Sequence, residues 1–80
     1  MNLSFATNLL EVPTSEELDN IQRYIRRNHS LRVHEFRMRT LDEGLILEGR
    51  TKTYYGKQLV QHAVMNLTEF PILANNIVVG

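Results

Sequence analysis

LRVHEFRMRTLDEGLILEGRT, residues 31 to 51, is the stretch that decides the fold of this chain. Residues 31 to 40 alternate between two sides, and a period of two is typical of a strand with one buried face. One side carries His34, Phe36 and Met38, and the other carries Glu35, Arg37 and Arg39. We therefore predict a strand over residues 31 to 40, with the first set facing the core.

The second half of this stretch returns as an antiparallel partner. Residues 41 to 44 (LDEG) predict a hairpin turn in which Gly44 is available for a positive φ. Residues 45 to 51 (LILEGRT) then form the second strand. In this strand we expect Leu45, Leu47 and Gly49 to face inward, and Ile46, Glu48 and Arg50 to face outward.

A helix is predicted on each side of the hairpin. Thr14 and Glu17 have the spacing of a capping box, which starts a helix that runs to about Asn28. Its apolar face is Leu18, Ile21 and Ile25. The second helix runs from about Tyr54 to Thr68, with Thr53 as N-cap. Its inward stripe is Leu59, Val60, Ala63, Val64 and Leu67, with Gly56 in the middle of that stripe.

The β-branched segment from residue 73 to 79 is short enough to be a third strand. The element order is then α-β-β-α-β. We predict an α+β domain in which two helices pack on one face of a three-stranded mixed sheet. This single domain spans residues 13 to 80, and residues 1 to 12 form a loosely ordered N-terminal arm.

Composition limits the class of protein. The 80 residues hold one small domain, and the absence of cysteine excludes disulfides and thiolate metal sites. Nine basic and nine acidic residues give zero net charge, so no overall field favours nucleic acid or membranes. No apolar run approaches the roughly 20 residues that cross a bilayer. Without a secretory signal we expect a cytoplasmic protein, or a periplasmic one if the chain is excised from an exported precursor.

The segment GRTKTYYGK, residues 49 to 57, resembles a phosphate-binding loop in composition only. Six residues separate Gly49 from Gly56, and Lys57 is followed by Gln58, whereas a P-loop has four residues and then Gly-Lys-Ser/Thr. We predict that both glycines serve packing. An anion site at the N-terminus of the second helix is the alternative.

No catalytic constellation, cofactor motif or metal site is evident. His29, His34 and His62 lack the spacing of metal ligands within a helix. The serines lack a nucleophile-elbow context. We therefore expect a binding module, not an enzyme.

A dense group of arginines is the strongest functional signal. Lipid or anion contacts are predicted at Arg23, Arg26, Arg27, Arg37 and Arg39, with Arg32 in the same group. Anionic headgroups, nucleic acid or an acidic protein would suit such a surface. The alternative is a solvated face neutralised by Glu16, Asp19, Glu35 and Glu48.

The outer sheet face is a second candidate surface. Ile46, Arg50 and Val78 are expected there, and an open face with apolar side chains suits a protein partner or a second copy. RNA binding has less support, because stacking needs aromatic side chains on the sheet, and Phe36 points inward.

From residue 17 to 79 the chain resembles a BON domain, a small bacterial module known from osmotic-stress and nodulation proteins. The strongest match is residues 45 to 51 (LILEGRT), an alternating strand interrupted by Gly49. Leu59, Ala63 and Leu67 fit the family's helix. Phe70 and residues 73 to 79 (LANNIVV) fit its closing segment.

This resemblance implies a mixed sheet with the first strand in the centre and both helices on one face. It also implies a non-enzymatic module that binds phospholipid or mediates protein interactions. Many such domains follow an export signal and occur in tandem, which this sequence does not show. We expect an anionic phospholipid surface as the partner, with a protein bound on the sheet face as the alternative.

Overall fold

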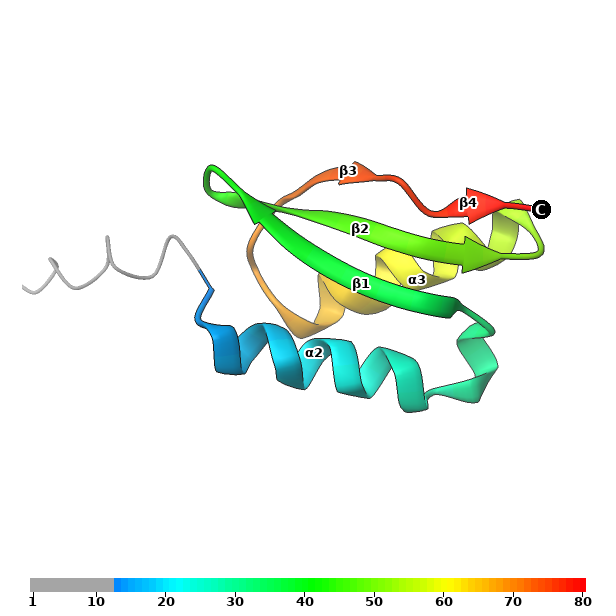
Figure 1. The fold of residues 1–80 in the computed structure, drawn as a ribbon, viewed down its shortest axis with the longest axis horizontal. Helices are drawn as coiled ribbons and strands as arrows, with labels where there is room; N and C mark the ends of the chain where they lie inside the picture. Colours follow the sequence, from blue (N-terminus) through cyan, green and yellow to red (C-terminus); the bar gives the residue numbers. More distant parts are fainter. Residues whose placement is uncertain (1–12) are drawn as a thin grey trace, which may run out of the picture.

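The computed structural model describes residues 13–80 (Figure 1). Its elements are α2 (Ser15–Arg27), the 3₁₀ turn η1 (His29–Leu31), β1 (His34–Leu41), β2 (Gly44–Thr51), α3 (Tyr54–Leu67), β3 (Ile72–Asn75) and β4 (Val78–Val79). The predicted α-β-β-α-β order and α+β class are confirmed. The predicted N-terminal arm, residues 1 to 12, lies outside the described residues.

The sheet is mixed, and β2 is its central strand. β1 pairs antiparallel with β2 on one side, while β3 and β4 pair parallel with β2 on the other. The expectation that the first strand is central is therefore wrong. The hairpin places β1 next to β2, and the crossover through α3 places β3 next to β2 on the other side. β1 is therefore an edge strand (Figure 1).

The predicted third strand is divided in two. Asn75 Oδ1 accepts a hydrogen bond from the Ile77 N–H at 3.2 Å, a local turn that interrupts the strand. The Asn75 amide nitrogen also donates to the Lys57 carbonyl of α3 at 3.3 Å. Ile77 consequently turns into the core, where it is 2% exposed. Pairing with β2 resumes at Val78.

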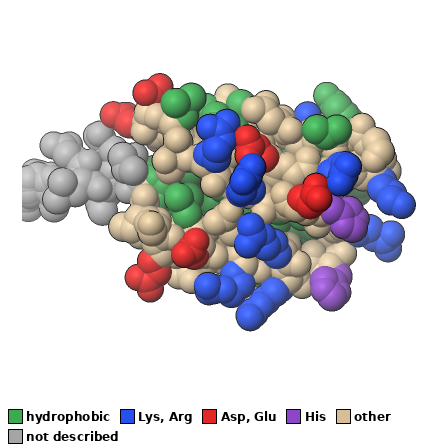
Figure 2. Space-filling view, in the orientation of Figure 1, with side chains coloured by type: hydrophobic (Ala, Val, Ile, Leu, Met, Phe, Trp, Pro, Cys, Tyr) green, Lys and Arg blue, Asp and Glu red, His purple; other side chains and the backbone are tan. Residues whose placement is uncertain are grey.

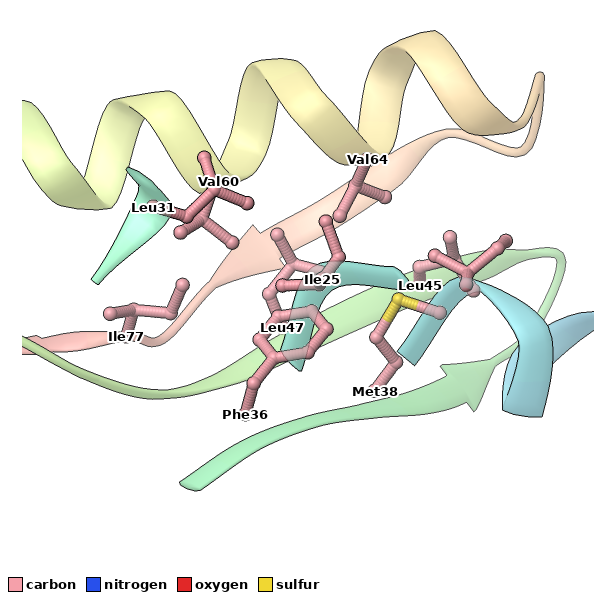
Figure 3. Packing of buried hydrophobic residues seen from close by; sticks show 10 residues of the cluster. Ile25, Leu31, Phe36, Met38, Leu45, Leu47, Val60, Val64 and Ile77 are labelled. Carbon is pink, nitrogen blue, oxygen red and sulfur yellow. The ribbon is translucent and has the colours of Figure 1, made fainter. Parts of the chain in front are cut away.

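Both helices pack on the same face of the sheet, as predicted. Figure 3 shows the buried side chains that meet between the helices and the strands. The core consists of Ile21, Ile25, Leu31, Phe36, Met38, Leu45, Leu47, Val60, Val64 and Ile77. Leu67 was expected in this core but is 39% exposed, at the last residue of α3.

The start of α2 follows from its local sequence. Thr14 Oγ1 accepts a hydrogen bond from the Glu17 N–H at 3.1 Å, and Glu17 Oε1 accepts one from the Thr14 N–H at 2.8 Å. The predicted capping box is therefore confirmed. Glu16 and Glu17 in the first turn and Arg26 and Arg27 in the last also suit the helix dipole.

A bulge in β1 changes which of its residues face the core. His34 pairs with Arg50 but Arg37 pairs with Glu48, so Glu35 and Phe36 together oppose Gly49. Glu35 adopts a left-handed conformation with φ of 56°. The extra residue shifts the alternation, and His34 is exposed instead of facing the core. The expected position of His34 is therefore wrong.

Gly49 lies where the bulge approaches β2 most closely. Its φ is +150°, and a Cβ at this position would lie 3.1 Å from the His34 carbonyl oxygen and 3.2 Å from the Phe36 Cα. Both neighbours are backbone atoms, which a side chain cannot displace cheaply. Gly49 therefore fits both the conformation and the space that the bulge leaves.

The hairpin turn uses its residues differently from the prediction. The positive φ belongs to Asp42, at 55°, and Gly44 is already the first residue of β2. Gly44 instead leaves room for a neighbour, because a Cβ there would overlap the Leu73 side chain. Asp tolerates the left-handed region better than most residues, which explains its place in the turn.

Candidate anion-binding surface

The zero net charge conceals a separation of charge along the molecule. The start of α2, the β1–β2 turn and the α3–β3 connection lie toward one end, and the α2–β1 and β2–α3 connections lie at the other (Figure 1). The first end carries Glu16, Glu17, Asp19, Asp42, Glu43 and Glu69. The remaining acids of residues 13–80, Glu35 and Glu48, are paired with arginines.

The opposite end carries four of the nine lysine and arginine side chains and no unpaired acid among the described residues, and we call it the basic end. It consists of Arg27, His29, Arg32, His34, Lys52, Tyr54, Tyr55 and Lys57. Figure 2 shows acidic side chains at one end of this face and histidine and basic side chains toward the opposite end, with basic side chains and further acidic ones beside them in the middle. Tyr54 and Tyr55 are 67% and 69% exposed. Two exposed tyrosines therefore stand among the cations.

The first turn of α3 runs against the usual distribution of charge on a helix. Acids are favoured at a helix N-terminus, where the backbone dipole is positive. This turn contains no acid and instead holds Lys57, whose Nζ lies 5.8 Å from the centre of the Tyr54 ring. Lys52 precedes the helix by two residues. The basic end therefore concentrates positive charge that a bound anion would offset.

The predicted arginines have different partners in the structure. Arg37 and Arg39 lie on the outer sheet face and share Glu48, at 3.4 Å and 2.9 Å. Arg23 donates to Asn20 on α2 at 3.1 Å. Of the predicted set, Arg27 lies at the basic end, at the last turn of α2.

Arg26 has a structural contact that sequence analysis did not foresee. Its Nε and Nη2 both donate to the Phe36 carbonyl, at 3.0 Å and 2.8 Å. One turn earlier, Gln22 Oε1 accepts from the Met38 N–H at 3.0 Å. These two side chains satisfy backbone groups on the free edge of β1, where unpaired groups would invite another strand.

Arg26 donates two hydrogen bonds to one carbonyl, and lysine cannot reproduce this geometry. Arg26→Lys should therefore lower the free energy of unfolding by about 1 kcal/mol although the charge is kept. Urea denaturation followed by circular dichroism measures this loss. Arg23→Lys, an equivalent change on the same helix, is the control and should be neutral within about 0.5 kcal/mol. Equal stability of the two variants would contradict the role assigned to Arg26.

The outer sheet face offers less to a partner than predicted. Ile46 lies outside the core cluster but is 5% exposed, because it sits in the central strand with Arg39 on one side and Ala74 on the other. Arg50 donates to Glu35 at 3.0 Å. Val78 is 60% exposed. Ile46 is therefore hardly accessible to a partner, and Val78 is the accessible apolar residue of the three.

Gly56 lies in the first turn of α3 and is partly exposed. A Cβ there would lie 3.2 Å from Thr53 Oγ1 and 3.4 Å from Thr51 Cβ. Its close neighbours therefore belong to the end of β2 and to the β2–α3 connection, not to the middle of the inward stripe. The Gly56 N–H donates to Thr53 Oγ1 at 2.9 Å, which makes Thr53 the N-cap that the sequence predicted.

The sequence analysis missed Lys52, Tyr54, Tyr55 and Lys57 as surface residues that act together with Arg32. A topological signal was present, because the two strands of a hairpin bring the segment before the first strand beside the segment after the second. Within residues 13–80 no group of acids and histidines gathers as metal ligands would. Neither described helix is long and apolar enough to cross a bilayer.

No family model matches this chain, and comparison with curated proteins and with solved structures found no match. The resemblance to BON domains therefore depends on the residues quoted above.

Proposed function

We propose that this domain is a non-catalytic module that binds anionic phospholipid surfaces end-on, through the basic end. The observation that carries the proposal is the reversed charge at the start of α3, where Lys57 occupies a turn that favours acids. Residues that break a local rule of stability often belong to functional sites. A surface of anionic headgroups would offset this repulsion.

The two exposed tyrosines fit the same partner. Tyrosine is favoured at the boundary between lipid and water, because its ring is apolar and its hydroxyl is polar. Tyr54 and Tyr55 are adjacent, and only Thr53 separates them from Lys52 along the chain. The basic side chains would supply long-range attraction and the tyrosines short-range contact. The resemblance to BON domains supports this class of function.

The acidic end would set the orientation of the bound domain. A molecule with opposite charges at its two ends is turned by the field of a charged surface before contact. The start of α2 and the β1–β2 turn would then point away from the bilayer. This orientation does not require a net charge on the whole protein.

The direct test is sedimentation with vesicles that contain or lack anionic lipid. Binding is expected to anionic vesicles only, and to weaken as salt rises, because the Debye length falls from about 10 Å at 0.1 M to about 3 Å at 1 M. Equal binding to neutral vesicles, or none to either kind, would contradict the proposal.

Replacing Lys57 by glutamate should separate binding from stability. An acid in the first turn of α3 is expected to raise the free energy of unfolding by about 0.5 kcal/mol. The same change should weaken binding to anionic vesicles by about tenfold or more, because one charge is reversed near the surface. Thermal unfolding and sedimentation measure the two effects. A variant that is more stable and binds as well as the original would exclude Lys57 from the site.

A protein-interaction module is the second candidate function. The observation in its favour is the exposure of Leu73 and Val78, at 50% and 60%, along the β3–β4 side of the sheet. This patch lies outside the basic end, so the two functions are separable by mutation.

A further inference from the structure

A hollow opens beside the basic end, between the segment around η1 and the β2–α3 connection. Its volume is about 880 Å³. Small-molecule pockets occupy roughly 300 to 1,000 Å³, so the hollow has room for a headgroup. Leu31, Val33 and Leu59 contribute apolar surface, and each also packs on the core. The hollow is therefore anchored to the rigid part of the domain.

The polar lining of this hollow has one sign of charge. Arg26, Arg32 and Lys52 line it beside His29 and His34, and none of the described residues that line it is acidic. The other large hollow, over the outer sheet face, differs because Glu35 and Glu48 line it beside arginines. The absence of internal counter-charge distinguishes the first hollow as a place for an anion.

Arg32 is held at the edge of this hollow by its backbone. Its φ is 52°, in the left-handed region that a non-glycine residue rarely adopts. The Arg32 N–H donates to the His29 carbonyl at 3.2 Å, which closes η1. Ser30 and Thr53 also line the hollow. Since the Gly56 N–H already bonds to Thr53, recognition would fall to side chains and not to the helix terminus.

We infer that this hollow receives a single phosphomonoester headgroup, and that the domain therefore prefers phosphomonoester lipids to phosphodiester lipids at equal surface charge. This inference rests on the proposed function. A phosphomonoester carries about −1.5 to −2 charge near pH 7 and three acceptor oxygens. A phosphodiester carries a single charge. Arg32 and Lys52 on one hollow suit the more highly charged group, because guanidinium and ammonium groups both donate to phosphate oxygens.

The test compares phosphatidylcholine vesicles containing phosphatidic acid, a monoester, with vesicles containing phosphatidylglycerol, a diester. The two compositions are adjusted to the same zeta potential. Binding should be about fivefold tighter to the phosphatidic acid vesicles, as expected for one further charge contact. Equal affinities would overturn the inference and leave the proposed function standing, whereas no binding to either would overturn both.

Lys52→Gln and Lys57→Gln form a matched pair for the same assay. Both remove one positive charge from the basic end, but Lys52 lines the hollow and Lys57 does not. Lys52→Gln should reduce the ratio of the two affinities to about one. Lys57→Gln should weaken binding to both lipids and keep the ratio near its original value of about five. Equal loss of the ratio in both variants would show that it reflects surface charge alone, against the inference.

Soluble glycerol 3-phosphate distinguishes recognition of the headgroup from recognition of the bilayer. At millimolar concentration it should shift the backbone amide signals of Arg32 and Lys52, and reduce binding to phosphatidic acid vesicles more than added sulfate of equal ionic strength. If the domain preferred phosphatidic acid vesicles but showed no such shifts, the preference would arise from a property of the bilayer. That result would overturn the assignment to the hollow.

Discussion

Gly49→Val should lower the free energy of unfolding by about 2 to 6 kcal/mol, from backbone strain and overpacking of about 1 to 3 kcal/mol each. The φ of +150° disfavours any side chain, and a β-branched one most strongly. The added atoms would also meet the backbone of the β1 bulge at His34 and Phe36. A domain of this size has roughly 4 to 12 kcal/mol of stability in all, so the loss would be large.

Urea unfolding of Gly49→Val and Gly44→Ala measures this effect against a control. At Gly44 the three atoms nearest the added Cβ all belong to the side chain of Leu73, which is half exposed, and none belongs to the backbone. Gly44→Ala should therefore cost about 1 kcal/mol or less. A Gly49→Val variant within 1 kcal/mol of the original would contradict the packing role, and unchanged stability with altered anion affinity would favour a phosphate loop.

The triple variant Arg32→Gln, Lys52→Gln, Lys57→Gln should bind anionic vesicles about 100-fold more weakly. Each basic side chain near an anionic bilayer contributes about 1 kcal/mol, and three of them amount to roughly two powers of ten in affinity. All three residues belong to the basic end, and none of them is in an ion pair within the described residues. Vesicle sedimentation over a range of lipid concentrations gives the affinities.

A second triple variant, Arg23→Gln, Arg37→Gln, Arg39→Gln, changes the net charge by the same amount. Two of these arginines, Arg37 and Arg39, form ion pairs with Glu48. We expect an arginine that is already in an exposed ion pair to contribute little to the binding of a third group. We expect a loss of less than about fivefold. If this variant lost more affinity than the first, the sheet face would be the binding surface, and the assignment to the basic end would be wrong.

The elements that sequence analysis predicted well depend on neighbours along the chain. The capping box needs Thr14 and Glu17 alone, and the apolar stripes of both helices follow the helical period. The β1–β2 hairpin follows from its turn and from alternation. These local signals were enough to define the α+β class, since two helices and a hairpin with apolar faces have few ways to pack.

The errors concern contacts between distant segments. Nothing near His34 indicates that β1 gains a residue opposite Gly49, because the bulge depends on pairing with the other strand. The division of the last strand depends on Asn75, which also bonds to α3. The central position of β2 is likewise a property of the whole topology and not of any one strand.

The candidate site illustrates the same limit. The arginines that are close in sequence have separate contacts, since Arg26 holds the Phe36 carbonyl while Arg37 and Arg39 pair with Glu48. The basic end instead joins Arg32 to Lys52, which are far apart in the sequence. Counting charges along the chain finds a basic cluster, but only the fold shows which cations lack an internal partner.

The central claim, that the basic end binds anionic bilayers, is tested most directly by amide NMR with lipid nanodiscs. The titration uses anionic and then neutral nanodiscs, at low and raised salt. We predict changes confined to residues 27 to 34 and 51 to 57, with anionic lipid alone, that fade as salt rises. Changes centred on Arg37, Arg39 and Glu48, or none with either lipid, would contradict the claim.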